Sequence, residues 1–239
     1  MSSQRLPGKV LLEILGKPIL WHIYNRLKNA KLLSDVVIST GEYENNAGIC
    51  NFAKNNNIEY FSGNEVDLID RLYKTAIKFD AAAIVRITAD CPLVDPKIVD
   101  KLVSEFITKH ESYDIVTNCQ TRTFPHGLDA EVYSTDILKK MWQEIDDVRL
   151  REWFPFYIEK NPSKFRILNI SDTNNNSQLR WTIDYPEDLE FVKQVYDDLY
   201  DENYIFGIDD VLNLLKKKPE LSTINSKYVG YHNVNAPQV

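Results

Sequence analysis

Cysteine and long apolar runs are scarce in this 239-residue chain. Its three cysteines, Cys50, Cys91 and Cys119, are widely spaced and form no CxxC pair, which argues against a disulfide framework or a zinc site. No apolar run reaches the roughly 20 residues of a membrane span, and the N-terminus lacks the apolar core of a signal peptide. We therefore expect a protein of the reducing cytoplasm that has no membrane partner.

Positive charge is also in the minority. Lysine and arginine total 28 against 35 aspartates and glutamates, which gives a net charge of −7 and a pI near 5.2. A protein that coats nucleic acid or an anionic membrane carries an excess of basic residues, so we expect neither partner. Hydrophobic residues make up 44% of the chain, enough to fill a core around a small-molecule site.

The first half of the chain alternates two kinds of apolar pattern. Short runs rich in β-branched residues predict strands, and apolar residues at helical spacing predict helices. The predicted strands span 35–40, 58–63 and 81–88, and the predicted helices span 18–30, 44–57, 66–79 and 95–106. Strands that alternate with helices of this length predict a parallel sheet covered on both faces.

The second half is less regular. Predicted strands span 113–118, 128–134, 164–170 and 180–184, and predicted helices span 135–145, 148–161, 185–200 and 208–221. No internal repeat and no linker rich in glycine and serine divides the chain. We therefore predict one compact α/β domain with an inserted mixed-sheet portion.

Two cations flank a Pro-Gly turn in the stretch RLPGK. Arg5 and Lys9 lie four residues apart, and the turn can aim backbone N–H groups and both side chains at one anion. The stretch is not a Walker A loop, because Lys9 is followed by Val10 and the leading glycine is absent. Taken alone, it fits a solvated turn at least as well as a phosphate site.

Two aspartates follow apolar segments that we predict as strands. Asp90 lies just past the strand that ends at Thr88, and Asp184 ends the segment RWTID. Ligands bind at the carboxyl ends of parallel strands, and a carboxylate there suits Mg²⁺ together with phosphate oxygens. Each aspartate could instead only cap a turn or a helix, and spacing alone does not bring the two together.

Three polar residues cluster in the stretch TFPHGLDAEVY. His126, Asp129 and Glu131 follow a turn at Pro125, and strand alternation puts the two acids on one face. A histidine with two acids suggests a metal site or acid–base chemistry, although a lone histidine near a turn is more often structural. No Ser–His–Asp or Cys–His arrangement is recognisable elsewhere.

Taken in series, these stretches resemble the sugar-acid cytidylyltransferase family, which includes CMP-KDO synthetase, CMP-sialate synthetase and spore-coat polysaccharide cytidylyltransferase-like proteins. The similarity runs from SSQRLPGKVL through SGNEVDLIDRLYKTA, VRITADCPLVDP and PHGLDAEVYS to RWTIDYPEDLEFV. It implies a Rossmann-like, three-layer nucleotide-diphospho-sugar transferase fold with a mostly parallel sheet. Within one domain over 1–239, residues 1–118 would bind the nucleotide, and residues 119–239 would bind the acceptor and close the site.

The resemblance also implies a reaction in which CMP moves from CTP to an anionic acceptor, with release of pyrophosphate, in cell-surface polysaccharide or glycoconjugate synthesis. Positioning and charge neutralisation supply most of the catalysis in such chemistry. The implied catalytic residues are Arg5, Lys9 and Asp90, and the implied nucleotide-binding residues are Ser3, Arg5, Lys9, Arg71 and Asp90. The implied Mg²⁺ ligands are Asp90 and Asp184, and the implied acceptor residues are His126, Asp129, Glu131 and Arg180.

Two departures from the family pattern bear on function. Members normally begin with an apolar strand that leads into the RLPGK loop, and Met1 aligns just after it, so we expect a truncated or misplaced start. Related chains tend to carry histidine at the position of Trp153, which leaves the acceptor open among an acidic sugar, a phosphonate and a phosphate. The family also implies a homodimer, with aromatic residues such as Trp142, Trp153 and Phe156 at the interface.

Other functions remain open at this point. A chain without its first strand could be a non-catalytic nucleotide-binding protein or a partner of an intact subunit. A nucleotidyltransferase that uses UTP or GTP ranks lower, because such enzymes usually begin with a glycine-rich loop. An in-frame stretch upstream of the Met1 codon that encodes an apolar strand would favour the enzyme, and a stop codon there would favour the non-catalytic protein.

Overall fold

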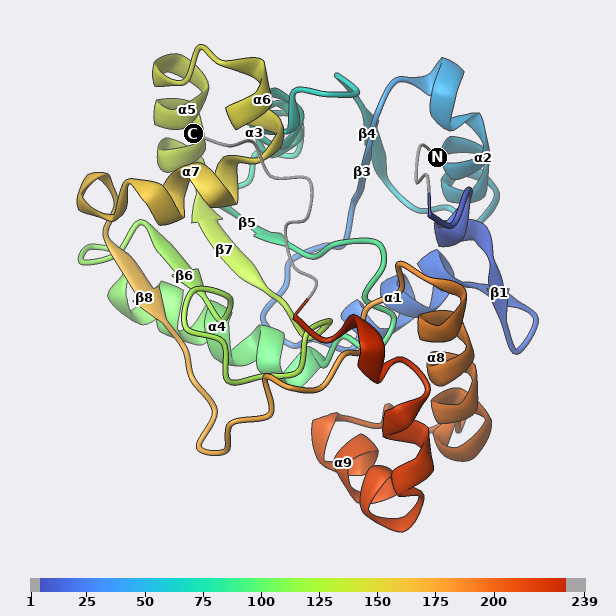
Figure 1. The fold of residues 1–239 in the computed structure, drawn as a ribbon. Helices are drawn as coiled ribbons and strands as arrows, with labels where there is room; N and C mark the ends of the chain where they lie inside the picture. The colour runs from blue at the N-terminus through green and yellow to red at the C-terminus, as the bar shows by residue number, and fades with distance from the viewer. Residues whose placement is uncertain (1–4, 231–239) are drawn as a thin grey trace.

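Helices and strands alternate along residues 5–230, the part of the chain that this computed structural model describes (Figure 1). The α-helices are α1 (Ile19–Leu27), α2 (Tyr43–Asn55), α3 (Leu68–Lys78), α4 (Pro96–Lys109), α5 (Thr135–Glu144), α6 (Val148–Glu152), α7 (Phe154–Lys160), α8 (Pro186–Leu199) and α9 (Ile208–Lys217). The strands are β1 (Glu13–Ile14), β2 (Lys17–Pro18), β3 (Ile38–Thr40), β4 (Tyr60–Ser62), β5 (Ala83–Arg86), β6 (Ile115–Thr117), β7 (Glu131–Ser134) and β8 (Ile167–Asn169). Short 3₁₀ turns are η1 (Lys9–Leu11), η2 (Pro162–Lys164), η3 (Pro219–Thr223) and η4 (Ser226–Tyr228).

The predicted elements are confirmed with two exceptions. The helix predicted over 148–161 is divided into α6 and α7 at Trp153, because Pro155 has no N–H with which to continue the first helix. The segment RWTID is not a strand. It makes one parallel bridge, between Arg180 and His126, and its remaining backbone bonds go to separate loops rather than to one neighbouring strand.

The main sheet has the strand order β5-β7-β6-β8. Strand β6 is parallel to β8, whereas β7 is antiparallel to both of its neighbours, so the predicted mixed-sheet portion is formed around β7. Strands β3 and β4 form a separate parallel pair, and β1 and β2 form a short antiparallel hairpin. Parallel and mixed strands with helices between them make up the α/β fold that the sequence predicts.

Alternating residues of β6 and β7 face two different hydrophobic clusters. Val116 and Val132 lie on one face and pack with residues of α1, α4 and α8. Ile115 and Tyr133, one position away on each strand, lie on the other face with residues of α3, α5 and α7. Side chains of a strand point alternately to the two faces, so this pattern confirms a sheet covered on both sides (Figure 1).

None of the helices within residues 5–230 combines the length and the apolar character needed to cross a membrane.

Candidate active site

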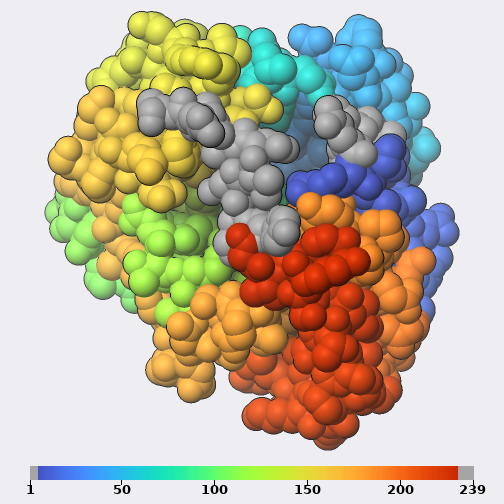
Figure 2. All heavy atoms as spheres, in the orientation of Figure 1, coloured from blue at the N-terminus to red at the C-terminus, as the bar shows by residue number. Residues whose placement is uncertain are grey.

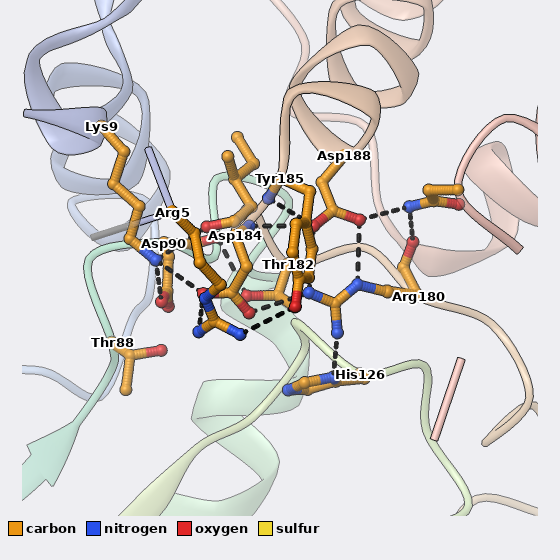
Figure 3. A network of polar contacts seen from close by, with 12 residues as sticks. Arg5, Lys9, Thr88, Asp90, His126, Arg180, Thr182, Asp184, Tyr185 and Asp188 are labelled. Carbon is orange, nitrogen blue, oxygen red and sulfur yellow. Dashed lines mark hydrogen bonds and ion pairs between the residues drawn. The ribbon is translucent and has the colours of Figure 1, made fainter. Parts of the chain in front are cut away.

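The RLPGK loop carries Lys9 to the centre of the candidate site. Gly8 has a φ of 67°, in the left-handed region that favours glycine, and η1 begins at the next residue. The Lys9 ammonium donates to Asp90 Oδ2 at 2.7 Å, to Asp184 Oδ1 at 3.0 Å and to the Ile183 carbonyl at 2.8 Å (Figure 3). An ammonium group has three protons, so one lysine joins the loop to two carboxylates far apart in the sequence.

Asp90 and Asp184 reach this point from two different loops. Asp90 follows β5 by four residues, and Asp184 immediately precedes the Tyr185 cap of α8. A backbone bond from Ile183 N to Asp90 O, 2.8 Å long, ties the two loops together. The sequence could not predict this contact from spacing, because the loops belong to elements that meet only in the folded chain.

The charge of Lys9 governs the ionisation of both carboxyl groups. Burial alone would favour the neutral acid, but the ammonium outweighs this effect and lowers the pKa of Asp90 to about 2. Burial likewise opposes ionisation of Asp184, and Lys9 and Arg180 together hold its pKa below the ordinary value. Both groups are therefore carboxylates at neutral pH, which suits cation binding and makes them poor general bases.

Arg5 lies on the outer side of the same cluster. Its Nη2 donates to Asp184 Oδ1 at 3.0 Å and its Nη1 donates to the Tyr185 hydroxyl at 3.3 Å. The guanidinium carbon lies 5.0 Å from the centroid of the Tyr185 ring, within the range of a cation–π contact. Ser3, which the sequence also assigns to the nucleotide, lies outside the described residues.

The two carboxylates fit a hard divalent cation. Asp90 and Asp184 offer oxygen atoms close enough to share one ammonium, and Mg²⁺ is usually bound by one or two carboxylates together with substrate phosphates and water. Among residues 5–230, no group of three or more histidine, cysteine, aspartate or glutamate side chains could form an all-protein cage. The remaining ligands of a bound Mg²⁺ would therefore come from phosphate and water.

Arg180 lies behind Asp184 rather than in the open part of the site. Its side chain is only 1% exposed, and it donates from Nη2 to Asp184 Oδ2 at 2.8 Å and from Nε to Asp188 Oδ1 at 2.9 Å. The acceptor role expected for Arg180 therefore does not fit its position, because the guanidinium is enclosed and occupied by two carboxylates. Its contacts are those of a residue that orients Asp184.

A cavity of about 560 Å³ extends away from the Asp90 and Asp184 cluster. It is lined by residues of β5, β7 and α7 and by the loops next to them, a size and setting typical of small-molecule sites. Six residues that the sequence assigns to substrate binding line it, namely Arg5, Arg71, Asp90, His126, Asp129 and Glu131. Arg71 Nη1 donates to the carbonyls of Asn64 and Glu65, and its buried Nε has no hydrogen-bond partner among residues 5–230.

Two arginines that sequence reasoning missed also line the cavity. Arg86, at the end of β5, is paired with Glu131, which also accepts a 2.7 Å hydrogen bond from the Tyr133 hydroxyl. Arg122 is paired with Asp129 through both of its terminal nitrogens, including a 2.9 Å bond from Nη2 to Oδ2. The available signal for Arg86 was a single cation inside the otherwise apolar run AAAIVRIT.

The aromatic residues expected at a dimer interface have contacts within this chain. Trp153 and Phe156 line the cavity. Trp142 donates from its indole nitrogen to Asp70 Oδ1 at 2.8 Å and lies 5.3 Å from the Tyr73 ring. The homodimer stays a prediction.

Two cations and two carboxylates that meet at one end of a cavity, on an α/β fold, are the arrangement expected of a nucleotidyltransferase. The sequence profile of the cytidylyltransferase family matches residues 1–216, and the chain belongs to that family.

Individual relatives agree with this assignment. The chain is 30% identical over 229 residues to an uncharacterised protein of Methanocaldococcus jannaschii, covering 94% of this chain and 90% of that protein. It is 26% identical over 231 residues to the spore coat polysaccharide biosynthesis protein SpsF of Bacillus subtilis, covering 93% of each. A 3-deoxy-manno-octulosonate cytidylyltransferase of Geobacter metallireducens is 33% identical over 106 residues, which cover 44% of this chain and 41% of that enzyme.

Solved structures show the same fold. A cytidylyltransferase of Leptospira borgpetersenii superimposes with a TM-score of 0.88 at 33% identity, covering 93% of this chain and 92% of that one. A CMP:2-keto-3-deoxy-manno-octonic acid synthetase complexed with CTP superimposes with a TM-score of 0.62 at 17% identity, covering 82% and 94%. At that low identity, the second likeness concerns the fold alone.

Proposed function

We propose that this protein transfers CMP from CTP to an anionic, sugar-type acceptor in the synthesis of a cell-surface polysaccharide or glycoconjugate. One observation carries the proposal: Arg5 and Lys9 converge on Asp90 and Asp184 at one end of the cavity. The cations can bind the phosphates of a nucleoside triphosphate, and the carboxylates can bind its divalent cation. A site with only one kind of group could bind only one of these two ligands.

In this reaction an oxygen of the acceptor attacks the α-phosphorus of CTP. The new phosphorus–oxygen bond forms as the bond between the α-phosphorus and the oxygen that bridges it to the β-phosphorus breaks. The electron pair of the broken bond leaves with pyrophosphate, and a hydroxyl acceptor releases its proton to water. Bound Mg²⁺ would neutralise negative charge on the phosphates. Asp90 and Asp184 would hold the cation, while Lys9 and Arg5 would bind the phosphates and stabilise the charge on the leaving pyrophosphate.

The far end of the cavity would receive the acceptor. Arg71, Arg86 and Arg122 line the cavity, and arginine suits carboxylate and phosphate groups because its planar fork can donate two parallel hydrogen bonds. Asp129 and Glu131 pair with two of these arginines and would hold them in place as the acceptor binds. We regard an acidic sugar as the first candidate, since the Geobacter and Bacillus relatives are named for such a sugar and for polysaccharide synthesis.

A pyrophosphate-release assay tests the proposal. The purified protein is supplied with CTP, UTP, ATP or GTP, Mg²⁺, and one member of an acceptor panel that holds acidic sugars, a phosphonate and a phosphorylated alcohol. We expect release with CTP and an acidic sugar, and a CMP adduct of matching mass. Pyrophosphate release with only the phosphonate or the phosphorylated alcohol would show that the acceptor is not an acidic sugar. Adduct formation with only UTP or GTP would contradict the cytidylyltransferase assignment.

We further propose that the protein acts in the cytoplasm, the compartment for which its scattered cysteines argue, and that it forms a homodimer. Family resemblance supports the dimer. Size-exclusion chromatography with light scattering at micromolar concentration should give twice the mass of one chain, and a monomeric mass would contradict it.

A further inference from the structure

The segment after α9 lies beyond residues 1–216, the part of the chain that the family profile matches. Its two 3₁₀ turns, η3 and η4, fold back toward the active site, and η3 packs against both α9 and α8. Figure 2 shows this red segment lying against the orange surface of α8. The helix it contacts is the one that begins just after Asp184.

Asn225 joins this segment to the site. Its side chain is buried, with 3% of the residue exposed, and its amide nitrogen donates to the Arg180 carbonyl and to Asp188 Oδ1, both at 2.9 Å. Because both partners are oxygen atoms, they fix which end of the amide carries the nitrogen. No residue between 201 and 224 makes a side-chain hydrogen bond to Arg180, Asp184 or Asp188 in the described structure.

Asp188 links Asn225 to the loop that carries Asp184. It is fully buried, and it accepts from Arg180 Nε and Nη2 and from the backbone N–H groups of Asp184 and Tyr185, at 2.9 to 3.0 Å. Arg180 then donates to Asp184 Oδ2, the oxygen of that carboxylate that does not face Lys9 (Figure 3). The position of Asp184 is thus fixed through its backbone and through its side chain by one buried carboxylate.

A second contact from the same segment supports Arg5. The ring of Tyr228 stacks on that of Tyr185, with centroids 3.7 Å apart and planes 2° from parallel. Tyr185 in turn accepts a hydrogen bond from Arg5 and lies within cation–π range of it. Both the acid and the cation on the outer side of the site therefore depend on residues 225–228.

We propose that Asn225 is a positioning residue of the active site, which orients the Asp184 carboxylate for the divalent cation through Asp188 and Arg180. This inference rests on the proposed function, because it assigns Asp184 to the cation that accompanies CTP. Residues that hydrogen-bond to metal ligands set the geometry of those ligands and hence the affinity of the metal site. The C-terminal segment is then part of the catalytic unit and not only a cover for α8.

The test compares two variants of Asn225 with a control from the same segment. Asn225→Ala removes both hydrogen bonds, and Asn225→Asp keeps the volume but puts an acid where a donor faces Asp188. Thr223→Ala is the control, because Thr223 is exposed and its hydroxyl bonds only to the Glu220 carbonyl. The affinity of each full-length protein for Mn²⁺ is measured by electron paramagnetic resonance in the presence of saturating CTP, and its affinity for CTP is measured by calorimetry in EDTA.

We expect both Asn225 variants to bind Mn²⁺ about three- to tenfold more weakly. Loss of a direct partner of a metal ligand costs about 10- to 100-fold, and Asn225 acts on Asp184 only through Asp188 and Arg180. The affinity of both variants for metal-free CTP should stay within about twofold of the wild type, and Thr223→Ala should match the wild type in both measurements. A purely structural role would lower the thermal midpoint and leave the Mn²⁺ affinity of the folded protein unchanged, which would overturn the inference. If Asn225→Ala does not fold, Asn225→Asp decides.

The same experiment separates this inference from the proposed function. Wild-type protein that binds neither CTP nor Mn²⁺ would overturn both. Wild-type protein that binds both ligands, with Asn225 variants that bind Mn²⁺ equally well, would overturn the positioning role alone.

Discussion

Lys9 donates three hydrogen bonds from its ammonium group, to oxygen atoms of Asp90, Asp184 and Ile183. Its charge overcomes the effect of burial on Asp90, and a single side chain therefore keeps two neighbouring acids ionised. Two carboxylates this close repel one another, and the charge of Asp90 acts to raise the pKa of Asp184. The arrangement keeps the negative charge ready for a divalent cation.

Replacing either carboxylate should stop turnover while leaving the fold intact. Asp90→Asn and Asp184→Asn each remove a ligand of the divalent cation but keep the shape of the side chain. A loss of several kcal/mol of transition-state stabilisation corresponds to a fall of roughly 100-fold or more in kcat. The pyrophosphate assay measures it, with Asp197→Asn, an exposed acid on α8, as the control. Either site variant running near the wild-type rate would remove that residue from the metal site.

The ion pair between Arg122 and Asp129 should give stability that depends on pH. Burial works against ionisation of Asp129, but the hydrogen bonds and charge of Arg122 prevail and hold its pKa below the ordinary value. A carboxyl whose pKa is lower in the folded state contributes stability that is present above its unfolded pKa, about 3.9, and is lost as the pH falls through the folded value. Arg122→Met removes the cause of this shift.

We therefore expect Arg122→Met to be less stable than the wild type at pH 7, by about 2 kcal/mol, because it leaves a largely enclosed carboxylate without its partner. The difference should shrink as the pH falls below about 4 and Asp129 becomes protonated in both proteins. Urea unfolding at several pH values measures it. A difference that stays constant down to pH 3 would show that Arg122 contributes packing rather than charge.

At the scale of elements, the loop before β7 approaches the loop before α8 unusually closely. Gly127 has a φ of 114°, and a Cβ atom there would lie 2.6 Å from both Trp181 C and Thr182 N. A side chain at this position would therefore be strained by its own backbone and would also collide with the neighbouring one. Hydrogen bonds from His126 N and Trp181 N hold the two loops together at this point.

Gly127→Ala should cost on the order of 3 kcal/mol of unfolding free energy, since it adds a backbone clash to the strain of positive φ. Gly16→Ala is a matched control. Gly16 also has a positive φ, 71°, but nothing lies within 4 Å of the added Cβ, so only the strain of about 1 kcal/mol applies. Thermal or urea unfolding compares the two. Equal losses would mean that the loops can move apart freely.

Periodicity predicted most elements because their apolar faces are continuous along the chain. α3, α4 and α8 bury residues at helical spacing, and β6 and β7 alternate between two clusters. The two errors have different causes. Pro155 divides the helix predicted over 148–161, because it has no N–H with which to continue α6. The segment RWTID has the composition of a strand, but tertiary contacts decide its structure. Trp181 N bonds to His126 O and Ile183 N bonds to Asp90 O, in two separate loops.

At the scale of the whole molecule, the site gathers residues from four distant parts of the chain. Hydrogen bonds that run through Arg180 and Asp188 join Arg5, Lys9, Asp90, Asp184 and Asn225. Figure 3 shows the part of this network between Lys9 and Asp188. The family resemblance assigns the chemistry of Arg5, Lys9, Asp90 and Asp184, because their motifs occur in series along the chain. Their distances could not be predicted, because sequence spacing does not report contacts between loops.

Two arginines of the cavity could not be identified from the sequence for the same reason. Arg86 and Arg122 have no motif of their own, and each becomes recognisable only through the acid it pairs with and the cavity it lines. The family resemblance implied that Arg180 contacts the acceptor. Its burial shows instead that it lies on the inner side of that residue.

We expect the cluster of Arg5, Lys9, Asp90 and Asp184 to bind CTP together with a divalent cation. Calorimetric titration with CTP, UTP, ATP and GTP, each with and without Mg²⁺, tests it most directly, on the wild type and on Lys9→Met. We predict binding that is selective for CTP, stronger with Mg²⁺, and weaker in Lys9→Met by about 2 kcal/mol because a charge-assisted contact is lost. If the folded wild-type protein binds none of the four nucleotides, this cluster is not a nucleotide site. If Lys9→Met binds CTP as tightly as the wild type, Lys9 does not contact the phosphates.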